Sequence, residues 1–209
     1  MAPRLKKASL KVTAFKSTDF PESNPGEIAF AGRSNVGKSS LLNRIMGTKK
    51  LVKVSSRPGF TQSINFYSII IGADQGDFKF FFVDLPGYGY AKAPRSVVRR
   101  WERLVGSYFS SNRLIKAVVT IFDVRRDPDV LDLELLSFLR FHGLNAIPVL
   151  NKCDKLGGGA LYKRTQSIKE QLGRLGVEPG AIADVFSVSA RTGRHVELLR
   201  SLLLSTLMD

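Results

Sequence analysis

GRSNVGKS, residues 32–39, matches the phosphate-binding loop pattern G-x-x-x-x-G-K-[ST] in full, and this stretch decides the fold. Its glycines let the backbone turn so that N–H groups point at phosphate oxygens. A helix that starts at the end of the loop adds the positive end of its dipole. In such a loop Lys38 contacts the β- and γ-phosphates, and the Ser39 hydroxyl binds Mg²⁺. The stretch therefore predicts a nucleoside triphosphate as the ligand.

The residues on both sides of the loop have the patterns that this motif requires. Residues 27–31 form a short, mostly apolar run that is typical of a buried strand. Residues 39–46 carry Leu41, Leu42 and Ile45 at the spacing of a helix. Because strand, loop and helix follow in the required order, a nucleotide site is favoured over a glycine-rich turn without a ligand.

The rest of the chain alternates between predicted strands and helices. Apolar or alternating runs predict strands at 64–71, 78–83, 117–122, 146–150 and 185–188, with a hairpin loop at 72–77. Apolar residues at helical spacing predict helices at 97–108, 130–141, 161–175 and 196–207. The pattern predicts an α/β fold with a mixed, mostly parallel sheet and helices on both faces. We expect one domain at 27–209, preceded by an extension, residues 1–26, that adds an edge strand at 10–15.

The charge of the chain predicts a polyanionic partner. Its 209 residues include 32 Lys and Arg against 18 Asp and Glu, a net charge of +14. Solubility of a small domain needs a net charge of only roughly 2–8, so nucleic acid is the favoured partner, ahead of an acidic membrane surface. No apolar run reaches the roughly 18 residues that span a membrane. One cysteine excludes an intrachain disulfide and fits a reducing compartment, so we expect the protein in the cytoplasm.

Asp84-Leu85-Pro86-Gly87 follows the predicted strand 78–83 directly. An aspartate at this place suits a contact to Mg²⁺ through water. The backbone N–H of Gly87 would reach a γ-phosphate, and a loop held by that contact is released when the phosphate leaves. Thr61 would complete the Mg²⁺ shell in the triphosphate state only, although Ser55, Ser56 and Ser63 are other hydroxyls nearby.

Asn151-Lys152-Cys153-Asp154 follows the predicted strand 146–150 and predicts recognition of guanine. An ionised Asp154 accepts hydrogen bonds from guanine N1–H and from the exocyclic amine. Adenine has an acceptor at N1, so it would leave this carboxylate unpaired. Asn151 and Lys152 would brace the loop. This motif argues against an ATPase or a kinase, and residues 186–190 would close over the base, with the contacting serine left open among 187–189.

Together these motifs resemble the EngB/YsxC (YihA) family of bacterial GTP-binding proteins that act in ribosome biogenesis. The likeness covers residues 10–205, and it is carried by the following segments and residues: 32–40, Pro58-Gly59, Thr61-Gln62, 64–66, 84–91, Trp101, Tyr108, Arg113, Leu114, Asp123, Arg125 and Asp132. The resemblance implies a GTPase that is a nucleotide-dependent switch in assembly of the large ribosomal subunit, with a family link to cell division and septation.

The motifs and the resemblance imply a complete set of site residues. Lys38, Thr61 and Asn35 are expected to act in catalysis. Mg²⁺ is expected to bind Ser39 and Thr61 directly and Asp84 through water. Contacts to GTP or GDP are expected from Gly32, Arg33, Ser34, Asn35, Val36, Gly37, Lys38, Ser39, Ser40, Gly59, Phe60, Thr61, Gln62, Asp84, Leu85, Pro86, Gly87, Asn151, Lys152, Cys153, Asp154, Phe186, Ser187, Val188, Ser189 and Ala190.

Three positions depart from the family pattern. Phe60 stands where a basic residue is usual, so no charged side chain is expected to meet a phosphate there. Asn151 stands where threonine is frequent and follows the general GTPase pattern. Val188-Ser189-Ala190 resembles the general Ser-Ala element, whereas the family register favours Ser187-Val188, so both registers stay open.

Two residues predict slow hydrolysis that needs outside help. Tyr88 follows Gly87, where many small GTPases have a glutamine that orients the attacking water. A tyrosine side chain has no amide for this task. Asn35 resembles the asparagine of potassium-activated relatives, in which a monovalent cation supplies positive charge near the β–γ bridge. We therefore hypothesise that K⁺ assists hydrolysis.

The basic surface has an expected centre on the predicted helix 97–108. Arg95, Arg99, Arg100 and Arg103 lie away from its apolar face, and Lys49, Lys50, Lys53 and Arg57 flank the segment that contains Thr61. Both groups adjoin segments expected to switch, which favours docking of a monomer on ribosomal RNA or the large subunit. The alternative is an RNA-binding module that uses GTP structurally, without turnover. His142, His195 and Cys153 form no metal or catalytic pattern.

Overall fold

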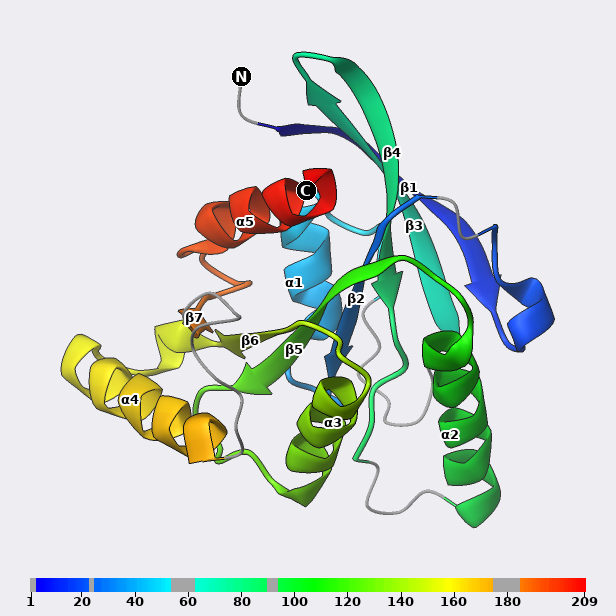
Figure 1. Cartoon of the computed structure of the whole chain (residues 1–209). Coiled ribbons are helices and arrows are strands. Elements are labelled where there is room, and N and C mark those ends of the chain that lie inside the picture. Colours follow the sequence, from blue (N-terminus) through cyan, green and yellow to red (C-terminus); the bar gives the residue numbers. More distant parts are fainter. Residues whose placement is uncertain (1–2, 23–24, 54–62, 90–93, 175–184) are drawn as a thin grey trace.

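The structure, a computed structural model, describes residues 3–22, 25–53, 63–89, 94–174 and 185–209 (Figure 1). Its strands are β1 (Arg4–Ala14), β2 (Glu27–Gly32), β3 (Ile64–Ala73), β4 (Gly76–Asp84), β5 (Ile115–Asp123), β6 (Ala146–Asn151) and β7 (Phe186–Ser187). Its α-helices are α1 (Lys38–Ile45), α2 (Arg95–Ser110), α3 (Val130–Phe141), α4 (Gly158–Arg174) and α5 (Val196–Met208). Two short 3₁₀ helices are η1 (Ser17–Asp19) and η2 (Cys153–Lys155).

The strands form one mixed sheet in the order β1-β3-β4-β2-β5-β6-β7. β1 pairs with β3 and β3 with β4 in antiparallel fashion. The pairs β4–β2, β2–β5, β5–β6 and β6–β7 are parallel. The predicted α/β fold with a mixed, mostly parallel sheet is confirmed.

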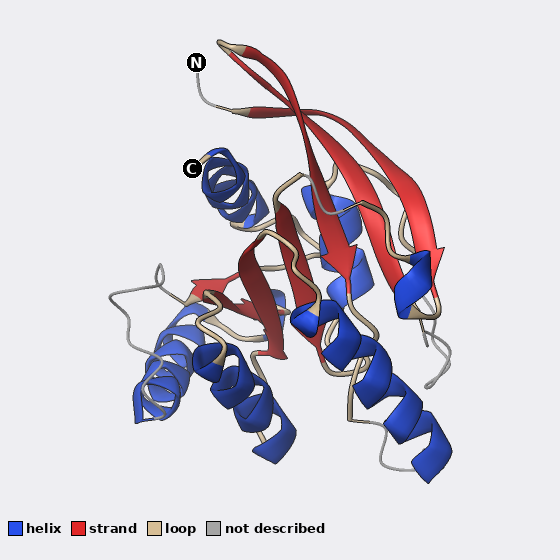
Figure 2. Ribbon diagram, turned by 45° about the vertical axis from the view of Figure 1, so that its right-hand side comes forward, coloured by secondary structure: helices blue, strands red, loops and turns tan. Residues whose placement is uncertain are grey.

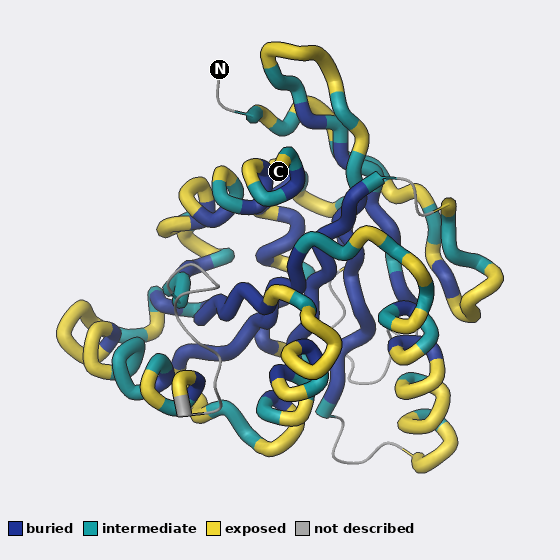
Figure 3. Tube along the Cα trace, viewed as in Figure 1, coloured by how far each residue is buried: buried dark blue, intermediate teal, exposed yellow. Residues whose placement is uncertain are grey.

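Helices cover both faces of the sheet (Figures 1 and 2). One apolar core joins α1 and α5 to the sheet, and a second joins α2, α3 and α4 to the other face. In β2, Ile28 and Phe30 belong to the first core, whereas Ala29 and Ala31 belong to the second. Because this central strand is buried on both faces, its sequence is apolar without alternation. Figure 3 shows the same burial along β2 and β6.

The antiparallel part of the sheet differs from the sequence prediction in extent. β3 and β4 run through most of the predicted loop 72–77, because their ladder continues to the pair Ala73–Gly76. β1 covers residues 4–14 rather than 10–15. Register shifts between Leu5 and Lys7 and between Leu10 and Val12 change the side-chain phase of β1. These bulges hide the alternation by which a longer edge strand would be recognised.

A buried ion pair joins Glu27, the first residue of β2, to Arg113 after α2, and Tyr108 on α2 bonds the same carboxylate. Glu27 is fully buried, and it accepts hydrogen bonds from Arg113 Nε at 3.0 Å and from Tyr108 Oη at 2.9 Å. Arg113 also donates to the carbonyl of Pro21 at 2.9 Å and lies 5.0 Å from the ring centre of Phe66. Both charges have several partners, as a buried ion pair requires.

The carboxyl ends of the parallel strands lie side by side along one edge of the sheet and bring residues of the predicted motifs together. β2, β4, β5 and β6 are parallel, and they end at Gly32, Asp84, Asp123 and Asn151. In open α/β sheets ligands bind outside the carboxyl ends of the strands. The fold therefore gathers the predicted phosphate and base motifs at a common edge.

Candidate nucleotide-binding site

The phosphate loop has a backbone that only particular residues allow. It joins the end of β2 to Lys38, the first residue of α1. Asn35 and Gly37 have φ angles of 68° and 92°, in the left-handed region. A Cβ on Gly37 would lie 2.5 Å from Nδ2 of Asn151. Gly37 is therefore required both by its backbone angle and by the close approach of Asn151, which begins the predicted guanine-recognition segment 151–154 (here called the base-reading segment).

Lys38 and Asp84 meet across the sheet edge. The Lys38 ammonium donates a hydrogen bond to the Asp84 carboxylate, and both residues are buried. Ser39 is half-buried in the first turn of α1, and Ser40 beside it is exposed. The Ser39 hydroxyl and the Asp84 carboxylate are hard oxygen donors, the type of ligand that Mg²⁺ prefers. This donor set fits the predicted metal.

Asn151 connects the base-reading segment to the phosphate loop. Its Nδ2 donates to the carbonyl of Val36 at 2.9 Å, and its Oδ1 accepts from the backbone N–H of Ala190 at 3.1 Å. Asn151 is 1% exposed, so both bonds lie in a dry environment. One side chain thus joins three segments that lie far apart in the sequence.

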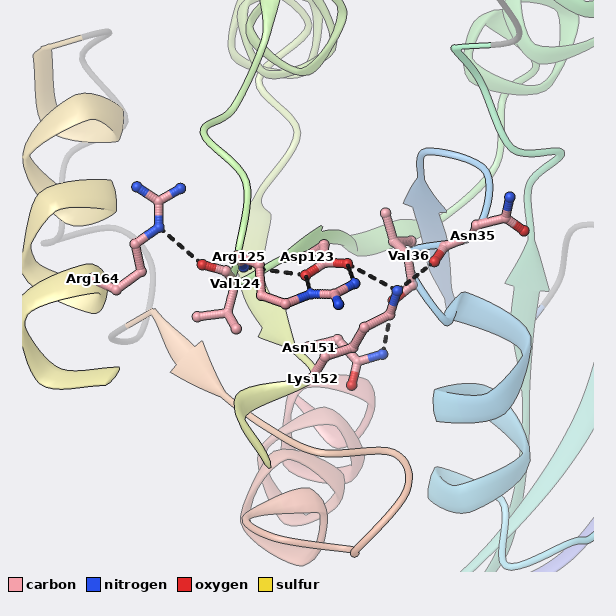
Figure 4. A network of polar contacts seen from close by, with 8 residues as sticks. All are labelled: Asn35, Val36, Asp123, Val124, Arg125, Asn151, Lys152 and Arg164. Carbon is pink, nitrogen blue, oxygen red and sulfur yellow. Dashed lines mark hydrogen bonds and ion pairs between the residues drawn. The ribbon is translucent and has the colours of Figure 1, made fainter. Parts of the chain in front are cut away.

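Lys152 is held by two oxygen acceptors (Figure 4). Its ammonium donates to the carbonyl of Asn35 at 2.6 Å and to Oδ2 of Asp123 at 2.9 Å. Arg125 binds the same carboxylate through Nε at 2.9 Å and Nη2 at 2.6 Å. Burial tends to raise the pKa of Asp123, but the hydrogen bonds from Arg125 and Lys152 outweigh it and hold this pKa below its usual range. A permanent negative charge therefore fixes Lys152 beside the phosphate loop.

The role of Asp123 was not assigned from the sequence, although its position carries a signal. It ends β5, and β5 pairs in parallel with β6, which ends at Asn151. An acidic residue at the end of a buried strand beside the base-reading strand is a candidate for this edge.

Asp154 is positioned by residues near the C-terminal helix. Ser189 Oγ donates to its Oδ1 at 2.6 Å, and Arg191 Nε donates to its Oδ2 at 2.9 Å. The bond from Ser189, supported by Arg191, lowers the pKa of Asp154. The carboxylate is therefore ionised near neutral pH, as recognition of guanine requires.

The two serine registers lie in different surroundings. Ser189 is fully buried and contacts Asp154, as described above. The Oγ of Ser187 lies 3.0 Å from Oγ1 of Thr165 on α4. Phe186 is half-buried, and Val188 is buried between β6 and η2, where its backbone bonds Leu150 and Cys153. The geometry thus joins Ser189, rather than Ser187, to Asp154, the residue predicted to recognise guanine.

Tyr88 points into the protein. It is 8% exposed, and its hydroxyl donates to Oδ1 of Asp132 on α3 at 2.7 Å. Burial, followed by the charge of Asp132, raises the pKa of the Tyr88 hydroxyl far above its usual value. The hydroxyl is therefore a constant donor that is already engaged.

Several predicted site residues lie outside the described part of the chain. These are Gly59, Phe60, Thr61 and Gln62, together with Arg57 in the basic group. Mg²⁺ ligation by Thr61 and the contact of Phe60 with GTP therefore stay predictions.

The predicted basic surface is exposed where the structure describes it. Arg95, Arg99, Arg100 and Arg103 are exposed on α2, and Lys49, Lys50 and Lys53 are exposed after α1. Nε1 of Trp101, on the same helix, donates to the carbonyl of Pro86 at 2.9 Å. This bond connects the arginine-bearing helix to the segment 84–87.

Cys153 and His142, for which the sequence predicts no catalytic or metal-binding role, pack against other residues of the protein. Cys153 is buried, and burial raises the pKa of its thiol, which disfavours a nucleophilic thiolate. The ring of His142 lies 4.3 Å from that of Phe138. Within the described ranges no three His, Cys, Asp or Glu side chains gather as a metal-binding group. None of the helices described has the length and apolar content to cross a bilayer.

Comparison with known proteins places these motifs in one group of proteins. A family model described as "50S ribosome-binding GTPase" matches residues 27–152. A probable GTP-binding protein EngB of Streptococcus mutans is 41% identical over 165 residues, which cover 79% of this chain and 80% of that protein. The protein of the same name from Kosmotoga olearia is 40% identical over 200 residues, covering 95% and 98% of the two chains.

Among the solved structures that are similar to this chain, one agrees with this grouping. The crystal structure of a probable GTP-binding protein EngB is similar with a TM-score of 0.62 and 26% identity, over 87% of this chain and 98% of that chain. Aquifex aeolicus Era bound to GDP·AlF₄⁻ is similar with a TM-score of 0.65 and 21% identity, over 88% and 58% of the chains. The likeness to Era concerns the fold alone.

Proposed function

The chain belongs to the EngB family of GTP-binding proteins and is a GTPase, and we propose that it hydrolyses GTP slowly as a nucleotide-dependent switch in assembly of the large ribosomal subunit. One observation carries the proposal. The phosphate loop, the segment 84–87 and Asp154 share one sheet edge, and the exposed arginines of α2 are connected to that edge through Trp101.

Guanine is selected at Asp154. The ionised carboxylate accepts from N1–H and the exocyclic amine of the base, while Ser189 and Arg191 fix its orientation. Asn151 and Lys152 tie this segment to the phosphate loop, so the base and the phosphates are held at a set separation. Adenine would leave a charged acceptor without its donors, which penalises ATP.

The phosphates are bound at the start of α1. Backbone N–H groups at the end of the phosphate loop and the positive end of the helix dipole would face them. The Lys38 ammonium would exchange its bond to Asp84 for the β- and γ-phosphate oxygens. Mg²⁺, held by Ser39, Thr61 and, through water, Asp84, would neutralise charge on the β- and γ-phosphates. The N–H of Gly87 would contact the γ-phosphate and so distinguish GTP from GDP.

Slow turnover follows from the position of Tyr88. Its hydroxyl is engaged by Asp132, so this residue does not orient the attacking water as a glutamine would. Asn35 is exposed on the phosphate loop, and its carbonyl is held by Lys152. We propose that K⁺ binds beside Asn35 and adds the positive charge that hydrolysis needs.

The arginines of α2 are the proposed contact to ribosomal RNA. They are exposed, and Trp101 on the same helix is bonded to the segment 84–87, which is proposed to sense the γ-phosphate. The chain as a whole has a net charge of +14. Phosphate contacts made by Arg and Lys supply most of the sequence-independent affinity for nucleic acid. The description of the matching family model, which names 50S ribosome binding, supports the same partner.

Co-sedimentation with ribosomal subunits tests the proposal. We expect the protein to pellet with large subunits in a non-hydrolysable GTP analogue and to do so less in GDP. The variant Arg99→Ala/Arg103→Ala should lose this binding, whereas a control with two other exposed cations removed, Lys11→Ala/Lys163→Ala, should keep it. Binding that ignores the nucleotide, or equal loss in both variants, would contradict the switch at α2.

The alternative is an RNA-binding module that uses GTP structurally. Multiple-turnover hydrolysis stimulated by ribosomal subunits would exclude it, and a single turnover would favour it. Residues 27–209 are proposed to form one GTPase domain of a cytoplasmic monomer, and residues 1–26 an extension whose strand β1 is the edge strand of the sheet. A role in cell division or septation is proposed from the family link alone.

A further inference from the structure

Helix α3 begins with two carboxylates that each have a second task. Asp129 caps the helix, and its Oδ1 accepts from the backbone N–H groups of Leu131 at 3.1 Å and Asp132 at 3.4 Å. Asp132 completes the capping box, because its Oδ2 accepts from the N–H of Asp129 at 3.0 Å. The cap therefore uses Oδ1 of Asp129 and Oδ2 of Asp132, and the other oxygen of each carboxylate takes no part in it.

The two remaining oxygens hold residues of the nucleotide site. Asp129 Oδ2 accepts from the guanidinium of Arg33, in the phosphate loop. Asp132 Oδ1 accepts from the hydroxyl of Tyr88, directly after Gly87. A cap needs neither contact, so helix capping alone does not account for this arrangement.

Arg33 and Tyr88 are also joined to each other. Their backbones form a parallel β-bridge, and the N–H of Ser34 donates to the carbonyl of Tyr88 at 3.1 Å. A Cβ on Gly89, which has a φ of 78°, would lie 2.7 Å from Nε of Arg33. The chain after Gly87 therefore lies directly on the side chain of Arg33.

Gly87 itself lies against the phosphate loop. A Cβ on this residue would lie 3.2 Å from Oγ of Ser34 and 3.5 Å from the carbonyl oxygen of Gly32. A displacement of Tyr88 moves the adjacent Gly87, and with it the N–H that would contact a γ-phosphate. The position of Gly87 thus depends on whatever holds Tyr88.

The contact between Tyr88 and Asp132 is dry and firm. The two residues are 8% and 4% exposed. The ring of Trp101 lies against that of Tyr88 at 6.2 Å between centres, in an edge-on arrangement. If Tyr88 moved away, a buried carboxylate oxygen would lose its donor, which is costly in such surroundings.

We propose that Asp132 through Tyr88, and Asp129 through Arg33, are positioning residues that hold Gly87 against the phosphate loop and so set the preference for GTP over GDP. This inference rests on the proposed contact between Gly87 and the γ-phosphate. GDP lacks that phosphate, so the anchors affect the two nucleotides differently. Tyr88 is then a mechanical link from the nucleotide to α3, rather than a substitute for the water-orienting glutamine.

Nucleotide affinities of conservative variants test the inference. Tyr88→Phe removes the hydroxyl and leaves the cap intact. Asp132→Asn keeps the shape but accepts with one oxygen instead of two. We expect each to weaken binding of a fluorescent, non-hydrolysable GTP analogue by about 3- to 10-fold, the worth of one hydrogen bond, and to change GDP affinity less than about twofold. The double variant should lose less than the sum of the two single losses, because both changes act on the same contact.

The matched control is Asp127→Asn, which makes the same chemical change in the loop before α3. Asp127 is 67% exposed at its side chain and pairs with Arg164, away from Tyr88. It should leave both affinities unchanged. Equal weakening of the analogue and of GDP, additive losses in the double variant, or no change in either nucleotide would overturn the inference. The assay contains no ribosomal particles, so these results are independent of the switch on the ribosome. A wild-type protein that binds adenine and guanine nucleotides equally would instead refute the proposed function.

Discussion

Replacing Asp154 by asparagine tests the proposed recognition of guanine most directly. Ser189 and Arg191 donate to the two carboxylate oxygens at 2.6 Å and 2.9 Å, so the group is ionised and has one orientation. Its free lone pairs are then available to the two donors of the guanine edge. Asp154→Asn keeps the size of the side chain and an acceptor for Ser189, but it replaces one acceptor with an N–H donor.

The magnitude follows from the bond that is lost and from the donors that are left facing each other. The variant loses one hydrogen bond to a charged partner, worth roughly 1.5–3 kcal/mol, and its new N–H group faces the guanine amine, which leaves donors unpaired at a further cost of roughly 1–3 kcal/mol. GDP affinity should fall by about 10² to 10⁴-fold. Xanthine has a carbonyl oxygen where guanine has its exocyclic amine, so it presents an acceptor to the new amide. The variant should therefore bind xanthosine diphosphate better than GDP.

Titration calorimetry with GDP, xanthosine diphosphate and ADP measures these changes. A GDP loss smaller than tenfold, equal weakening of all three nucleotides, or no preference for xanthine would refute the reasoning. The lowered pKa of Asp154 adds a second readout on the wild-type protein. A depressed carboxyl pKa keeps its contribution at every pH above the ordinary value of about 3.9. GDP affinity should thus be constant from pH 7 to about 5, and Asp154→Asn should remove any loss seen at lower pH.

Three further predictions address stability, RNA binding and catalysis. Glu27→Gln should lower the free energy of unfolding by about 3–5 kcal/mol in urea titrations, because it leaves Arg113 buried without its counter-charge; the double change Glu27→Met/Arg113→Met should cost less than that. Arg99→Ala/Arg103→Ala should reduce the slope of log affinity against log salt for ribosomal RNA by about 1.4–1.8, and an unchanged slope would exclude α2 as the contact. GTP hydrolysis should be faster in K⁺ than in Na⁺, and Asn35→Ala should remove the difference; equal rates in both salts would end the potassium hypothesis.

Local pattern predicted most of the secondary structure, for reasons that individual elements show. Helix α3 was predicted at its observed bounds, since its leucine spacing is regular and an aspartate caps it. The strands β2, β5 and β6 are buried on both faces, so their apolar runs are conspicuous in the sequence. The edge strand β1 was placed too late and too short, because two bulges break its alternation.

The sequence alone determined the ligand chemistry of this protein. The phosphate loop and the Asn-Lys-x-Asp segment are short, and their requirements are local: left-handed backbone at fixed positions, a charge at the end of a loop, and a carboxylate after a strand. Because these requirements are local, they can be recognised in short stretches of sequence. The composition adds that the chain has a net charge of +14, which favours a polyanionic partner.

Only the tertiary structure decided how these segments act on one another. The bond from Tyr88 to Asp132 spans 44 residues, and that from Lys152 to Asp123 spans 29. Contacts of this kind depend on strand order and on which helix covers which face, and these arise from packing of the whole sheet. For that reason the sequence showed only that a tyrosine stands where many GTPases have a glutamine, whereas the fold gave Tyr88 a hydrogen-bond partner on α3.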